Sequence, residues 1–174
     1  MSLLDRLLGR VELPVGFTGR LDPEDRLLAA ASTDAGPLLV TSLGLWLPEP
    51  DGPAHRIGWH LINKVSWQAG TLTVTEAAEL DVVDGAVLIA DRPPRRLRLA
   101  DPGRVPEAVQ ARVEGSIRSR HHRPLPGGGA WFVQRKVPGR DGVLLQVRAD
   151  PGTDEAALRR VAASVAASLP RPAS

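Results

Sequence analysis

The sequence predicts a mostly β protein of the α+β class, built on a small antiparallel barrel of about seven strands. Seven or eight short segments between residues 27 and 100 alternate apolar and polar side chains. Tight-turn dipeptides such as Asp84-Gly85 separate them, which is the pattern of small barrels and sandwiches. A helical period follows at 105–117, and a β-hairpin and a second helix complete the chain.

Length and composition permit such a core. The chain has 174 residues, of which 43% are hydrophobic. A domain of this size buries about 70% of the surface that its unfolded chain exposes. Because there is no cysteine, thiol catalysis, disulfides and Cys-zinc sites are excluded. No apolar run approaches the ~18 residues that span a bilayer and no signal peptide opens the chain, so we expect a cytoplasmic protein.

Residues 1–20 form the first expected unit, an N-terminal docking segment. Four leucines between residues 3 and 8 share one face of a short helix. A helix of this length is marginally stable alone, so we expect it to dock on the core.

Residues 21–123 form the second expected unit, the barrel with its capping helix. Its predicted strands are 27–32, 38–47, 56–62, 64–68, 71–75, 82–83, 86–90 and 95–100. The alternation directs Trp59, Trp67, Leu72 and Val74 into the barrel. Ala69-Gly70 and Asp84-Gly85 are expected to be two-residue hairpin loops.

The capping helix begins at Val105-Pro106, since proline suits the first helical turn. Valines recur every four residues on the face expected to close the barrel. The helix is expected to end in the cationic run 118–123, where cations complement the helix dipole. Pro124 then stops it, and the glycines at 127–129 are expected to be a flexible link.

Residues 124–174 form the third expected unit. Strands 130–137 and 143–149 pair across an Asp141-Gly142 turn. Thr153 or Asp154 caps the closing helix. We expect this unit to pack on the same core, so that the chain is one compact body.

The order of about seven strands followed by one amphipathic helix resembles that of a pleckstrin-homology-like barrel. The pieces LLVTSLGLWLP (38–48) and RIGWHLINKVSWQAGTLTV (56–74) look like the second to fifth strands of bacterial members of that superfold. More narrowly, GWHLINKVSW, SIRSRHHRPLPGGG (116–129) and RKVPGRDGVLLQV (135–147) resemble an uncharacterised family of small actinobacterial proteins of ~170 residues. That resemblance implies no activity, because the superfold hosts lipid, peptide and protein binding alike.

Charge is distributed unevenly along the chain. Residues 1–90 carry 6 basic and 12 acidic side chains, whereas residues 91–174 carry 16 basic and 8 acidic. The halves could complement each other or offer a face to an anionic partner. Arginine outnumbers lysine 20 to 2, so a compositional preference for solvated arginine is the alternative explanation.

The sequence presents no catalytic, metal-ligating or cofactor-binding constellation. G-x-S-x-G is missing, and the glycine run at 127–129 lacks the Lys-Ser/Thr of a phosphate loop. The histidine pairs His55/His60 and His121/His122 are not spaced to share a metal. We therefore expect no enzyme, although distant carboxylates such as Glu76 and Asp81 could converge.

The candidate binding residues form one basic cluster with no aromatic residue in it. Its members are Arg118, Arg120, His121, His122 and Arg123, and Arg135, Lys136 and Arg140 of the following hairpin are candidates to join them. Guanidinium groups suit carboxylate or phosphate. The alternative is a solvated helix end. Of the tryptophans, Trp59 and Trp67 are expected in the core, while Trp46 and Trp131 stay open.

The sequence therefore favours a non-catalytic binding module that engages a protein partner or its own copy. An anionic lipid headgroup or nucleic acid on the same cluster is the first alternative. We expect nucleic acid less, because single-strand binders interleave aromatics with basic groups, and membrane only as a peripheral contact. An enzyme with dispersed acid and base residues is the second alternative.

Overall fold

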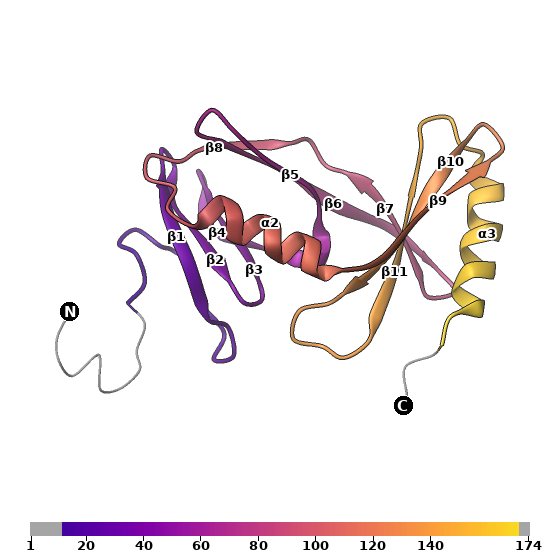
Figure 1. Cartoon of the computed structure of the whole chain (residues 1–174), viewed down its shortest axis with the longest axis horizontal. Helices are drawn as coiled ribbons and strands as arrows, with labels where there is room; N and C mark the ends of the chain where they lie inside the picture. The colour runs from indigo at the N-terminus through magenta and orange to yellow at the C-terminus, as the bar shows by residue number, and fades with distance from the viewer. Residues whose placement is uncertain (1–11, 171–174) are drawn as a thin grey trace.

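The computed structural model describes residues 12–170 and confirms a mostly β protein with a small, partly closed barrel (Figure 1). The helix predicted at 3–10 lies outside the described residues. Two lobes lie side by side, with the barrel lobe at one end of the molecule and a second sheet with its own helix at the other. The long strand β6 runs through both.

The elements follow one another in this order: β1 (Leu27–Thr33), β2 (Gly36–Thr41), β3 (Gly44–Glu49), β4 (Gly52–Gly58), the 3-10 turn η1 (Trp59–Leu61), β5 (Ile62–Gln68), β6 (Thr71–Val83), β7 (Ala86–Asp91), β8 (Arg95–Arg98), α2 (Val105–Ser116), β9 (Ile117–Leu125), β10 (Gly128–Lys136), β11 (Val143–Ala149) and α3 (Glu155–Ser168).

The barrel lobe consists of two antiparallel sheets and α2. One sheet has the order β1-β2-β3-β4, and the other joins β5 and β8 to the first half of β6. A bridge between Thr33 and Leu99 connects the two sheets on one side. Between β4 and β5 the chain passes through η1 instead of pairing, and α2 packs against β5, η1 and β1 there.

The core of the barrel lobe follows from alternation along its strands. Leu38, Leu45 and Leu72 are fully buried, and α2 adds Val105 and Val109. Burying an aliphatic side chain of this kind contributes about 1.5–3 kcal/mol. The predicted capping helix is therefore confirmed, with the predicted valine face inward.

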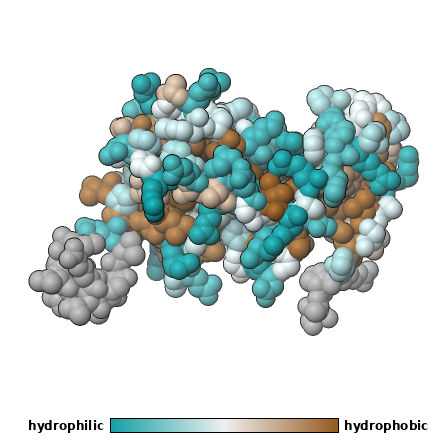
Figure 2. Space-filling view, in the orientation of Figure 1, coloured by the Kyte–Doolittle hydropathy of each residue, from teal (hydrophilic) through white to brown (hydrophobic). Residues whose placement is uncertain are grey.

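The second lobe, called here the sheet lobe, has a separate core. Its strands run β6-β7-β11-β10-β9, with β7 and β11 parallel, and α3 covers one face. Phe132, Val147 and Leu158 are among the buried residues. Hydrophobic residues are visible beside α3 in Figure 2. The prediction that residues 124–174 pack on the same core as the barrel is therefore wrong, because α3 packs on a sheet that extends beyond the barrel.

Turn chemistry was predicted correctly. Ala69 and Gly70 have φ of 50° and 77°, and Asp84 and Gly85 have 49° and 92°. Two successive positive φ values match the right-handed twist of a hairpin. Asp154 caps α3, since its Oδ2 accepts from the Ala157 N–H at 2.9 Å.

The basic run 118–123 is not a helix end, which corrects the main prediction about it. The helix α2 stops at Ser116, and Ile117 is already extended, with φ −86° and ψ 121°. The run belongs to β9, which pairs with β10 over nearly its whole length. Strand pairing therefore outweighs the weak local helix signal. The glycines at 127–129 are not a flexible link: Gly127 lies in the tight turn between β9 and β10, and Gly128 and Gly129 are the first residues of β10.

Three smaller strand predictions also differ from the structure. Residues 38–47 are two strands, separated at Ser42-Leu43, and the segments at 71–75 and 82–83 are one strand, β6. Trp59 is buried as expected, but it lies on η1. Trp67 is 39% exposed. It lies beside the Ala69-Gly70 turn on β5, an edge strand, so no neighbour covers its second flank.

Within residues 12–170, no helix combines the length and the apolarity needed to cross a bilayer.

Candidate functional site

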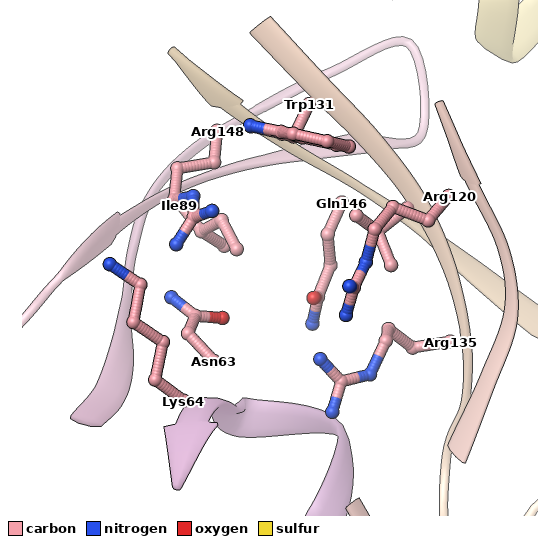
Figure 3. A pocket seen from close by; sticks show the side chains of 9 residues that line it. Asn63, Lys64, Ile89, Arg120, Trp131, Arg135, Gln146 and Arg148 are labelled. Carbon is pink, nitrogen blue, oxygen red and sulfur yellow. The ribbon is translucent and has the colours of Figure 1, made fainter. Parts of the chain in front are cut away.

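A pocket of about 190 Å³ lies between the two lobes (Figure 3). We call it the interlobe pocket; its lining residues are Asn63, Lys64, Ile89, Arg120, Trp131, Val133, Arg135, Gln146 and Arg148. Asn63 and Lys64 come from β5 of the barrel lobe, and the others from β7, β9, β10 and β11. Its volume is below that of most sites for drug-sized ligands, so it takes a small group or the end of a larger molecule.

Strand alternation explains which residues line the pocket. On β10, Ala130 and Phe132 face α3, so Trp131, Val133 and Arg135 face the other way. On β9, Arg120 is paired with Val133, and paired residues of antiparallel strands share a face. The pocket is thus the face of the sheet lobe that α3 leaves free.

Arg135 is a buried cation without a carboxylate partner among the described residues. It is 3% exposed. Its Nε donates to Ser116 Oγ at 3.0 Å, and its Nη2 donates to the carbonyl oxygens of Trp59 and Ile62 at 2.8 and 3.0 Å. All three acceptors are neutral. The remaining nitrogen, Nη1, points into the pocket (Figure 3).

The electrostatics of the pocket follow from this arrangement. Burial, and then the nearby charge of Arg120, lower the pKa of Arg135 to about 10. Arg135 is therefore still a cation at neutral pH, and it lies close to a second cation. An anion between Arg120 and Arg135 would supply the missing countercharge.

Asp91 neutralises only the opposite side of the pocket. Its carboxylate accepts from Lys64 Nζ at 3.3 Å, Arg148 Nη1 at 3.1 Å and Asn63 Nδ2 at 2.7 Å. Burial acts to raise the pKa of Asp91, but these hydrogen bonds outweigh it and the pKa is lowered. One carboxylate thus serves two cations, and the pocket keeps an excess of positive charge.

Trp131 forms one wall of the pocket. Figure 3 shows its ring almost edge-on, so that one face of the indole is turned to the open space. His122 packs edge to face on Trp131, with ring centroids 5.1 Å apart. The His122 Nε2 lies 2.6 Å from Asp150 Oδ2, which fixes that imidazole in turn. His122, the cross-strand neighbour of Trp131, therefore packs beside the aromatic wall and is itself fixed by Asp150.

Two side-chain amides in the lining, those of Asn63 and Gln146, have oxygen atoms that accept no hydrogen bond from the described residues. Asn63 Nδ2 donates to Asp91, and the side-chain oxygen of Asn63 is turned toward the pocket (Figure 3). Gln146 is 1% exposed, and its Nε2 donates to the His60 carbonyl oxygen at 2.7 Å. No group among the described residues donates to Gln146 Oε1. Buried polar atoms normally have partners, so this wall lacks a donor.

The structure divides the predicted basic cluster. Arg120 and Arg135 line the pocket, and His122 supports Trp131. His121 and Arg123 alternate with them, so they lie on the opposite face of β9. Of the remaining three, Arg118 and Lys136 are exposed outside the pocket, and Arg140 lies in the β10–β11 connection.

Sequence reasoning missed the other half of the site. Asn63, Lys64, Trp131, Gln146 and Arg148 line the pocket but were not proposed as site residues. Alternation from Phe132 would have placed Trp131 beside Arg135, whereas the approach of β5 to β11 depends on tertiary structure. The objection that the cluster contains no aromatic residue does not hold in three dimensions, because Trp131 lines the same pocket as Arg120.

The pocket offers binding groups rather than a reactive constellation. None of its lining residues is a carboxylate. In the part of the chain that the structure describes, no group of three His, Asp or Glu side chains is arranged to hold a metal ion. Comparison with protein-family models, curated proteins and solved structures found none that matches this chain.

Proposed function

We propose that this protein is a non-catalytic binding module that holds an anionic group of its ligand or partner in the interlobe pocket. The observation that carries the proposal is the buried guanidinium of Arg135, which among residues 12–170 meets only neutral acceptors and a second cation, Arg120. A partner protein or a second copy of the chain that presents a phosphate or carboxylate would be held in the same way.

The energetics favour an anion at this place. Removing a charge from water has an effective cost of several kcal/mol in proteins unless other groups compensate. Carbonyl oxygens compensate part of that cost at Arg135, but Nη1 is left free. A phosphate or carboxylate oxygen there would form a charge-assisted hydrogen bond, which is about twice as strong as a neutral one.

The same geometry disfavours acid–base catalysis. A catalytic acid or base needs a pKa near the working pH, often because burial raises that of a carboxyl group. The pKa of Asp91, whose carboxylate bonds to the lining, is instead lowered by three donors. Asp91 acts as a clamp that orients Asn63, Lys64 and Arg148.

Two substitutions on one strand test the proposal. Arg120→Gln removes a pocket cation, and Arg123→Gln removes the same charge from the opposite face of β9. Binding of inorganic phosphate, pyrophosphate and sulfate is measured by isothermal titration calorimetry in low salt. We expect binding by the native chain and by Arg123→Gln, and at least tenfold weaker binding by Arg120→Gln.

Two outcomes of this titration would overturn the proposal. If no anion binds the native chain, or if the two variants lose affinity equally, the interlobe pocket is not an anion site and the proposal fails.

A further inference from the structure

We infer that the anionic ligand is a nucleotide, whose phosphate lies at Arg120 and Arg135 and whose base stacks on Trp131. This inference rests on the proposed function and adds the ligand class. It is carried by the juxtaposition, in one pocket, of an unneutralised pair of guanidinium groups, a free indole face and unused amide acceptors.

The cationic side of the pocket matches a phosphate group. Arg135 Nη1 and the guanidinium of Arg120 point toward one another across a short gap in Figure 3. Guanidinium groups bind phosphate through paired hydrogen bonds. Both arginines come from adjacent strands, β9 and β10, so the sheet itself fixes their spacing.

The aromatic side matches a planar base. Trp131 is half-buried and packs against His122, and its open face borders the same space. Val133 of β10 and Ile89 of β7 add further apolar groups to the lining of the pocket. Every nucleobase has a π face, and stacking on an aromatic side chain is a general means of holding one.

The amides distinguish a nucleotide from a plain aromatic phosphate. Asn63 turns its oxygen to the pocket, and no donor to Gln146 Oε1 is present in the part of the chain that the structure describes. Ribose hydroxyls and the amino groups of adenine, guanine or cytosine supply such donors. An aromatic phosphate without donor groups would leave both amide oxygens unsatisfied.

The pocket is smaller than a whole nucleotide, so a single nucleotide would fill it and extend from its mouth, and a run of nucleotides would not fit. The pocket measures about 190 Å³ and has a single aromatic wall. Proteins that bind single strands along their length use several stacking side chains in a basic groove. The ligand is therefore a free nucleotide or the terminal nucleotide of a strand, which share this chemistry.

The experiment compares four probes by titration calorimetry on the full chain: AMP, UMP, ribose 5-phosphate and inorganic phosphate. We expect AMP to bind at least about tenfold more tightly than ribose 5-phosphate, which lacks the base. UMP also has a base and is expected to bind more tightly than ribose 5-phosphate. Equal affinities for AMP and ribose 5-phosphate overturn the inference, while the proposed function stands if phosphate still binds.

A pair of tryptophan variants locates the stacking contact. Trp131→Leu is expected to remove the advantage of AMP over ribose 5-phosphate, and Trp67→Leu, an exposed tryptophan of the barrel lobe, to keep it. If both variants keep it, the base does not stack on Trp131. The comparison of AMP with ribose 5-phosphate is made on the native chain. It therefore tests the inference even if the Trp131→Leu variant does not fold.

Chain length separates the two sources of the ligand. If a 5′-phosphorylated 20-mer of deoxythymidylate binds about as tightly as TMP, the site accepts a strand end; if it binds much more weakly than TMP, the site takes only the free nucleotide. Affinity that rises steeply with length, as counterion release along a strand produces, contradicts a one-nucleotide site.

Discussion

Arg135 on β10 donates from Nη2 to the backbone carbonyl of Trp59 at 2.8 Å, across 76 residues of sequence. The same nitrogen also donates to Ile62 O, and Nε donates to Ser116 Oγ at the end of α2. One guanidinium therefore bonds the sheet lobe to the barrel lobe while it presents its last nitrogen to the interlobe pocket.

Replacing Arg135 by methionine is expected to lower the free energy of unfolding by about 3 kcal/mol. The substitution leaves the buried carbonyl oxygens of Trp59 and Ile62 without this donor, and each unsatisfied group costs roughly 1–3 kcal/mol. Urea unfolding measures the change. Lys136→Met, one residue away and exposed, is the control and should stay within about 0.5 kcal/mol of the native chain. A loss below about 1 kcal/mol for Arg135→Met would mean that the bonds between the lobes contribute little.

The two tryptophans near the start and end of the η1–β5 segment are expected to differ sharply in stability effect. Trp59 is 2% exposed and its Nε1 donates to Thr41 O at 3.0 Å, so Trp59→Ala should cost about 3–5 kcal/mol. Trp67 is 39% exposed, and Trp67→Ala should cost about 1 kcal/mol. Denaturant melts of the two variants decide the point, and equal losses would contradict the placement of Trp67 at the barrel rim.

The cap of α3 provides a local test of the sheet lobe. Asp154→Ala removes the acceptor for the Ala157 N–H and should destabilise the protein by about 1 kcal/mol. Hydrogen exchange of the α3 amides should become faster, because the helix depends on that cap and on its packing against the sheet lobe. Asp141→Ala, in the β10–β11 connection, is the control. Unchanged exchange in α3 for Asp154→Ala would show that packing alone holds this helix.

Acid sensitivity is expected to involve His60. Burial, followed by the charges of Arg135 and Arg140, lowers the pKa of His60 from 6.5 to about 4. The unfolded chain binds this proton at higher pH than the folded chain does. Stability from this group is therefore complete above pH 6.5 and is lost as the pH falls toward 4.

Unfolding free energies at several pH values between 4 and 7 check that expectation. His60→Asn should flatten the slope in this window, whereas His121→Asn, at an exposed residue of β9, should leave it unchanged. A native slope that survives His60→Asn would assign the acid sensitivity to another group.

Local features of the fold could be predicted from the sequence because they depend on near neighbours. Asp84-Gly85 predicts a hairpin because both central positions of such a turn need a positive φ, which few residue types other than Gly, Asn and Asp tolerate. Pro106 and the valine spacing predict the start and the buried face of α2. The end of α2 was predicted wrongly, because residues 117–125 form a strand only when β10 lies beside them.

The sequence predicts the part of the site that depends on local features and not the part that depends on tertiary structure. Arg120 and Arg135 were selected by charge alone, but charge did not separate Arg120 from Arg123, which alternation on a strand places on the other face. Lys64 and Arg148 are far apart in sequence and meet only through Asp91. Their convergence is a property of tertiary structure that no local pattern records.

The central claim, an anion site at the interlobe pocket, is tested most directly by the four indole N–H signals in a ¹H–¹⁵N NMR spectrum during titration with inorganic phosphate. Of the four tryptophans only Trp131 lines the pocket, so its signal should shift progressively and saturate, while those of Trp46 and Trp67 stay in place. A titration in which the Trp131 signal does not move, or in which Trp67 moves equally, would contradict the account.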